Sequence, residues 1–192
     1  MKSGVRALGV AESYQGATAG PAPDPESVLA GAVVRADRVL DGLAFETCTV
    51  GGSDATDAVL ALARDLGRED VRYLLLSGIA PAWFNLLDLR RLHAELDVPV
   101  LSVSYGGSPG LADALRAEFA DEALETRLET YRDQPPRREL AVGDDRVFVR
   151  EVGIEADAAD AVVRGFTPAG SGRPEPLRVA RLAARAGRRF RE

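Results

Sequence analysis

Val71-Arg72-Tyr73-Leu74-Leu75-Leu76-Ser77-Gly78 is the stretch that decides the fold of this 192-residue chain. A short apolar run closed by a polar residue and a glycine is typical of a strand that is covered on both faces. Val98–Val103 has the same character, and Asn85–Leu96 between the two runs carries leucines at helical spacing behind a potential N-cap. Strand, helix and strand in this order predict two parallel neighbours in one sheet.

The residues before this unit predict three further strands and a helix. Val5–Glu12 is the first strand, and Ser27–Val34 with Arg38–Val50 forms a hairpin. Between them, residues 16–25 are rich in glycine, proline and alanine and predict a surface loop. Gly51-Gly52 ends the hairpin, and a helix is expected to begin at Ser53 or Asp54.

The residues after the unit predict mostly helices. Helical patterns run from Ser108 to Phe119 and then up to Arg132, and another covers Glu155–Arg164. Arg138–Val149 predicts a small hairpin. An early hairpin followed by alternating strands and helices favours a single α/β domain over residues 1–192, with a mixed sheet and helices on both faces.

Composition excludes several classes of protein. Hydrophobic residues make up 46% and charged residues 28%, and no apolar run approaches the roughly 18 residues of a membrane span. The first residues lack the apolar core of a secretory signal, so we expect a cytoplasmic protein. One histidine, His93, gives no material for a histidine-based triad or metal cluster. The single Cys48 cannot form an internal disulfide, and we assign it no role.

A basic helix is predicted at residues 175–190, directly after Arg173-Pro174. Two prolines suit the entry and first turn of a helix, where a missing N–H has no consequence. Residues 173–192 contain seven arginines and two glutamates in a chain whose net charge is −6. The arginines recur at three- and four-residue steps, so they share one face. We expect Arg173, Arg178, Arg181 and Arg185 to bind phosphates; a solvated helix face is the alternative.

Two acids stand where strands end. Glu12 closes the first strand and Asp54 follows Gly51-Gly52, so both are expected at one edge of the sheet, where paired carboxylates hold Mg²⁺ or Mn²⁺. The structural alternative is that Asp54 is a plain N-cap and that Glu12 is a solvated strand end. Asn85 and Asp88 form a second polar pair beyond Ser77, which is readily explained structurally as an N-cap and its N3 acid.

Several motifs together carry a family resemblance. They are Gly9-Val10-Ala11-Glu12-Ser13, Asp41-Gly42, Thr49-Val50-Gly51-Gly52-Ser53-Asp54-Ala55-Thr56, Ser77-Gly78-Ile79-Ala80, Trp83-Phe84-Asn85 to Asp88, and Pro174-Glu175-Pro176. In this combination the chain resembles an uncharacterised archaeal family, domain of unknown function number ninety-nine. That family in turn is similar to endonuclease V, which has a ribonuclease H-like mixed sheet.

The resemblance implies a function and a set of site residues. Endonuclease V cuts nucleic acid beside deaminated adenine with magnesium held by three acids, whose counterparts here are Glu12, Asp54 and Ser77. The implied activity is a divalent-metal-dependent nuclease acting on DNA or RNA, with Glu12 and Asp54 catalytic and Asp88 as a further metal ligand. Ser77 brings no charge to its position, so the alternative is a nucleic-acid-binding module that has lost cleavage.

Overall fold

The computed structural model describes residues 1–14 and 26–191, and the predicted surface loop at 16–25 lies outside the described residues. Fourteen elements follow one another along these residues. They are β1 (Arg6–Glu12), β2 (Glu26–Arg35), β3 (Leu40–Thr49), α1 (Ala55–Leu66), β4 (Val71–Ser77), α2 (Pro81–Phe84), α3 (Leu89–Leu96), β5 (Val100–Ser104), α4 (Ala112–Glu118), α5 (Asp121–Arg132), β6 (Arg138–Val142), β7 (Asp145–Val152), α6 (Ala156–Phe166) and α7 (Glu175–Arg191). None of these helices is long and apolar enough to cross a membrane.

The strands form one seven-stranded sheet in the order β3-β2-β1-β4-β5-β7-β6. The early hairpin makes β1, β2 and β3 antiparallel, whereas β4 runs parallel to both β1 and β5. β7 then pairs antiparallel with β5 and with β6. The predicted parallel pair and the predicted mixed sheet are therefore confirmed. Because β1, β4 and β5 are parallel, their carboxyl ends at Glu12, Ser77 and Ser104 share one edge of the sheet.

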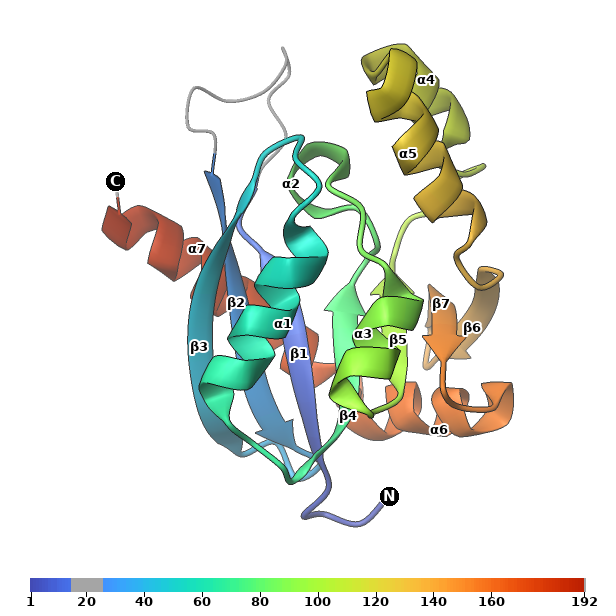
Figure 1. The fold of residues 1–192 in the computed structure, drawn as a ribbon. Helices are drawn as coiled ribbons and strands as arrows, with labels where there is room; N and C mark the ends of the chain where they lie inside the picture. The colour runs from blue at the N-terminus through green and yellow to red at the C-terminus, as the bar shows by residue number, and fades with distance from the viewer. Residues whose placement is uncertain (15–25, 192) are drawn as a thin grey trace.

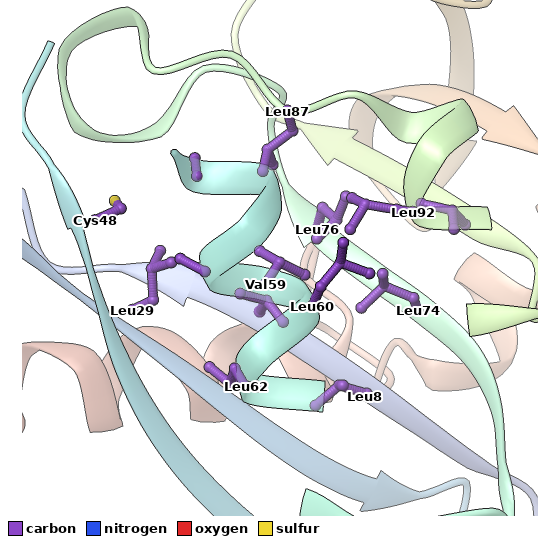
Figure 2. Close-up of a cluster of buried hydrophobic side chains, with 14 of the residues drawn as sticks. Leu8, Leu29, Cys48, Val59, Leu60, Leu62, Leu74, Leu76, Leu87 and Leu92 are labelled. Carbon is purple, nitrogen blue, oxygen red and sulfur yellow. The ribbon is translucent and has the colours of Figure 1, made fainter. Parts of the chain in front are cut away.

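Helices cover both faces of the sheet. α1 and α3 lie over one face, while α7 crosses the opposite face beneath β1 and β2 and α6 lies near β4 and β5 (Figure 1). Figure 2 shows the hydrophobic core between the sheet and helices α1 and α3. In this core, leucines from α1 and from strands β1, β2 and β4 point toward one another. Cys48 reaches this core from the edge strand β3 and is buried.

The Pro174-Glu175-Pro176 string has a structural role at the start of α7. Pro176 lies directly on Gly9 of β1, where a Cβ atom would come within 2.3 Å of the Pro176 carbonyl carbon. Only glycine permits such a close approach of helix and strand. Glu175 accepts two hydrogen bonds from Arg178, at 2.6 and 2.7 Å. The string therefore fixes α7 on the sheet, and its position sets where the later arginines lie.

Two predicted helices begin later than expected. The prediction that Asn85 caps a helix reaching Leu96 is wrong, because α3 begins at Leu89 and its N-cap is Asp88, whose carboxylate accepts from the Arg91 N–H at 2.9 Å. Residues 85–88 instead lie outside any helix, and Asn85 and Asp88 are extended. α4 begins at Ala112 rather than at Ser108, because Gly110 has a φ of +128°, which no helical residue adopts.

Candidate functional site

Glu12 ends β1 as a half-buried carboxylate. One of its oxygens, Oε2, accepts a hydrogen bond from Ser27 Oγ at 2.9 Å and another from the Tyr14 N–H at 2.7 Å. Burial nevertheless raises the pKa of Glu12 above its usual value, despite these hydrogen bonds and the nearby charge of Arg181 on α7. An acid held by donors in a poorly solvated position is not a solvated strand end. Such perturbed carboxyl groups are common at functional sites.

Asp54 lies at the N-terminus of α1, yet its side chain makes no capping hydrogen bond to the helix. Its carboxylate turns back to the end of β3, where Oδ2 accepts from Thr49 Oγ1 at 2.7 Å, and Oδ1 accepts from Asn85 Nδ2 at 2.5 Å. Burial alone would raise the pKa of Asp54, but these hydrogen bonds outweigh it and the pKa is lowered. Asp54 is therefore held ionised and oriented at neutral pH.

Asn85 is the residue that holds Asp54 in place. Its side chain is fully buried and bridges three groups, because Oδ1 accepts from the Ala55 N–H at 2.9 Å while Nδ2 also donates to the Thr49 carbonyl at 2.8 Å. Asn85 thus caps α1 from a distant segment, and does not cap the helix that was predicted to begin at Asn85 itself. The sequence gives no signal for this contact across thirty positions.

Cys48 links the environments of the two acids. It pairs with Ser27 across β2 and β3, and Ser27 is the donor to Glu12. Burial, with a smaller contribution from the negative charges of Asp54 and Glu12, raises the pKa of the Cys48 thiol to about 12. Both carboxylates therefore act on one buried sulfur. The thiol stays protonated at neutral pH and is no nucleophile.

The third proposed metal ligand, Asp88, does not complete a cluster with Glu12 and Asp54. The carboxylate of Asp88 caps α3, and the backbone N–H of Asp88 donates to Thr56 Oγ1 at 3.0 Å. Within residues 1–14 and 26–191, no three histidine, cysteine, aspartate or glutamate side chains gather in an arrangement that could hold a metal ion. Glu12, Asp54 and Asp88 are thus not brought together as a three-acid cluster. Ser77 lines a separate pocket at the ends of β4 and β5.

Sequence reasoning missed Arg127 on α5. Its guanidinium is buried and donates to the Gly51 carbonyl at 2.5 Å, the Gly52 carbonyl at 2.8 Å and the Phe84 carbonyl at 3.3 Å. It therefore ties α5 and α2 to the turn that presents Asp54. An arginine in an amphipathic helix carries no mark of such a distant backbone partner, so no sequence signal could have found it.

The α2 segment adds strain and aromatic surface beside this turn. Ala82, Trp83 and Phe84 all have left-handed φ angles between 46° and 59°. Such a run of non-glycine residues is unfavourable unless the surroundings hold it. The Ala82 carbonyl accepts from the Gly51 N–H at 2.7 Å, and the Trp83 ring lies edge-on to Tyr14 with centroids 6.4 Å apart. An aromatic pair therefore stands beside Glu12.

The four proposed phosphate-binding arginines do line one hollow, together with Leu182. Its volume is about 280 Å³. Arg178 is paired with Glu175, and Arg173 stacks over the Tyr105 ring at 4.1 Å. Arg181 and Arg185 have no carboxylate partner among the described residues. The charge of Arg181 acts on both Glu12 and Tyr105, where it partly offsets the rise in pKa that burial causes. The positive hollow and the acidic strand end are thus neighbours.

The chain is similar to proteins of known sequence and known structure. A UPF0215 protein of Thermococcus kodakarensis is 36% identical over 163 residues, which are 84% of this chain and 81% of the relative. A crystal structure of a protein of unknown function from Archaeoglobus fulgidus matches with a TM-score of 0.80 and 24% identity, over 95% of this chain and 97% of the other.

Endonuclease V has the same fold. The Ciona intestinalis enzyme, bound to a 24mer DNA containing an inosine followed by a ribo-adenosine, matches with a TM-score of 0.65 at 11% identity, over 98% of this chain and 87% of the other. The expected endonuclease V-like, ribonuclease H-like fold is therefore confirmed, while the numbered family of unknown function stays a prediction. The family model described as Endonuclease dU matches residues 3–187, so this chain belongs to the Endonuclease dU family.

Proposed function

We propose that this protein is an endonuclease that cleaves nucleic-acid phosphodiester bonds at the carboxyl-end edge of its sheet, with Glu12 and Asp54 as the catalytic acids. The observation that carries the proposal is the contrast between these acids. Burial raises the pKa of Glu12, whereas hydrogen bonds from Thr49 and Asn85 lower that of Asp54. Two nearby carboxyl groups whose pKa values are pushed apart are typical of catalytic sites.

The donor set suits a divalent cation. Mg²⁺ is commonly held by one or two carboxylates together with substrate phosphates, so Glu12 and Asp54 suffice as its protein ligands. Both acids place negative charge around the Cys48 sulfur, and Glu12 is poorly solvated, a condition that a cation would relieve. When bound, the metal would supply Lewis-acid assistance at the scissile phosphate. Asn85 would keep Asp54 oriented toward it.

The basic hollow on α7 supports a polyanionic substrate. Arg181 and Arg185, which have no acid partner among the described residues, would bind backbone phosphates beside Glu12. Tyr14 and Trp83 would offer an aromatic surface for a base on the other side. The family description and the inosine-containing ligand of endonuclease V make DNA with deoxyuridine or deoxyinosine the first substrates to test.

A second function is favoured by a specific observation. Ser77 stands where the resemblance to endonuclease V implies a third acid, and no three potential ligands gather in the part of the chain that the structure describes. The alternative is therefore a module that binds nucleic acid through the same arginines without cutting it.

Cleavage assays separate the two. End-labelled DNA and RNA oligonucleotides with one deoxyuridine, one inosine or neither, single-stranded and duplex, are incubated with Mg²⁺, Mn²⁺ or EDTA. We expect metal-dependent cleavage near the modified base. Glu12→Gln and Asp54→Asn should each reduce the rate by about a hundredfold, the scale seen when one such group is removed from an active site.

Asp65→Asn is the matched control, because Asp65 is an exposed acid at the opposite end of α1. It should cleave like the wild type. Binding without cleavage under every metal condition would contradict the nuclease proposal and support the binding module. Cleavage that survives both Glu12→Gln and Asp54→Asn would remove these residues from the site.

A further inference from the structure

A second pocket lies at the same edge of the sheet, on the face that α3 covers, and we call it the serine-arginine pocket. It has a volume of about 240 Å³ and lies between the ends of β4 and β5 and helix α5. Its polar lining comes chiefly from Ser77, Ser102, Ser104, Ser108, Arg137 and Arg150. Phe148 and Tyr131 supply aromatic walls. The register of the sheet places Arg150 opposite Ser102, so both side chains leave the sheet on the same face.

Two arginines in this pocket have no carboxylate partner among the described residues. Arg137 stacks over the Phe148 ring at 3.9 Å and donates to the Ser108 carbonyl at 3.1 Å, to Ser104 Oγ at 3.1 Å and to the Gly106 carbonyl. Arg150 donates to the Pro135 carbonyl. Each guanidinium has five N–H donors, so these contacts orient both groups and leave donors for a ligand.

The electrostatics of the pair are unfavourable without a ligand. Burial lowers the pKa of Arg150, the hydroxyl of Tyr131 partly offsets this effect, and the charge of Arg137 adds a smaller lowering. The adjacent Arg138 shows the ordinary arrangement, since its guanidinium is paired with Glu151 at 2.7 Å. Two neighbouring positive charges in a partly buried pocket without an acid are unfavourable on their own. An anion between them would offset both the repulsion and the lost solvation.

We propose that the serine-arginine pocket binds a phosphate group of the nucleic acid. Guanidinium groups match the oxygens of phosphate in planar, two-pronged hydrogen bonds, and serine hydroxyls add neutral donors. The pocket contains Ser77, at the end of the strand next to β1, so a phosphate held there lies along the same sheet edge as Glu12. The nucleic acid as its source rests on the proposed function, whereas the phosphate chemistry does not.

Isothermal titration of the full chain with inorganic phosphate, at constant ionic strength, tests the pocket. We expect saturable binding that Arg150→Gln weakens by about tenfold or more, as the loss of a charge-assisted hydrogen-bonding group predicts. Arg146→Gln is the matched control on the same strand, because Arg146 is exposed and pairs with Glu139 at 3.4 Å. Arg150→Lys keeps the positive charge but loses the planar pair of N–H donors, so this variant should bind phosphate with intermediate strength.

Thermal unfolding of each variant shows that it is folded. Arg137→Gln also removes contacts that hold the loop at residues 106–108, so Arg150→Gln and Arg150→Lys carry the test if that variant does not fold. Absence of phosphate binding by the wild type, or unchanged binding by Arg150→Gln, would overturn the proposal.

Trinucleotides with and without a 5′-phosphate identify the source. Stronger Arg150-dependent binding of the phosphorylated form indicates a terminal phosphate, equal Arg150-dependent binding indicates a backbone diester, and Arg150-independent binding of both contradicts the site. The nuclease proposal is judged separately. A protein that cuts nucleic acid but binds no phosphate loses only this pocket, and one that binds phosphate through Arg150 but never cuts loses only the nuclease.

Discussion

At the scale of single residues, Glu12 carries an energetic cost that its neighbours only partly offset. Ser27 and the Tyr14 N–H both donate to the carboxylate, yet burial still raises its pKa. If this position were purely structural, an uncharged side chain would occupy it at a lower cost in free energy. Retention of an unfavourable charge is typical of functional sites, where stability is given up for activity.

Glu12→Gln should therefore stabilise the fold at neutral pH. A carboxyl group whose folded pKa is raised favours the folded state below its ordinary value of 4.5 and loses that contribution as the pH rises through the folded value. We expect the variant to be more stable by about 0.5–2 kcal/mol at pH 7 to 8, the range of single stabilising changes. Below pH 4.5 the difference should vanish.

Urea unfolding across this pH range measures the effect. Glu69→Gln is the control, since Glu69 is an exposed glutamate and the same change there removes a charge that the fold does not bury. A Glu12→Gln variant that is less stable than the wild type at neutral pH would show that the carboxylate is structural.

At the scale of elements, α7 combines two roles along its length. Its first turn packs against β1 through Pro176 and Gly9, and its next turns present Arg181 and Arg185 in the basic hollow. Arg188, further along the same helix, donates to the Ser13 carbonyl at 3.4 Å. Because the sheet covers one side of α7, only some of its arginines, among them Arg181 and Arg185, remain available to a ligand.

Reversing the charge of Arg181 and Arg185 together to glutamate should weaken nucleic-acid binding and flatten its salt dependence. For duplex DNA, each lost phosphate contact reduces the slope of log K against log salt by about 0.9. Fluorescence anisotropy with a labelled duplex at several salt concentrations measures both quantities.

The control is a double reversal of Lys2 and Arg72 to glutamate, which changes the net charge equally at exposed positions; Arg72 lies near the amino end of β4. An equal loss of binding in this control would mean that the overall charge, and not the hollow on α7, holds the nucleic acid.

At the scale of the whole molecule, the mixed sheet brings together parts of the chain that are far apart in sequence. The carboxyl ends of β1 and β4, the turn after β3 and the flank of α7 all meet at one edge (Figure 1). A ligand that binds several of these segments at once stabilises the folded state and not the unfolded chain.

Mn²⁺ or Mg²⁺ should therefore raise the midpoint of thermal unfolding. At a hundred times the dissociation constant the gain is about 2.7 kcal/mol, and each kcal/mol corresponds to about 2–4 °C for a chain of this size. Differential scanning calorimetry with increasing metal measures the shift. The Glu12→Gln, Asp54→Asn double variant should lose it, while Asp65→Asn should keep it; an equal shift in all three would place the ion elsewhere.

The strands, their alternation with helices and the basic C-terminal segment follow from local patterns, because burial imposes its periodicity on neighbouring residues. The sequence by itself therefore determined the mixed sheet and the candidates at Glu12, Asp54 and α7. Only the tertiary structure decided that Asn85 anchors Asp54, that Arg127 binds the Gly51-Gly52 turn, and that Arg137 and Arg150 share a pocket without an acid. The first two contacts join residues far apart in the chain. Arg137 and Arg150 are closer in sequence, but neither carries a mark of the pocket lining that β5 and α5 add. Hydrogen-bonding side chains leave no periodic trace of partners that folding alone brings near.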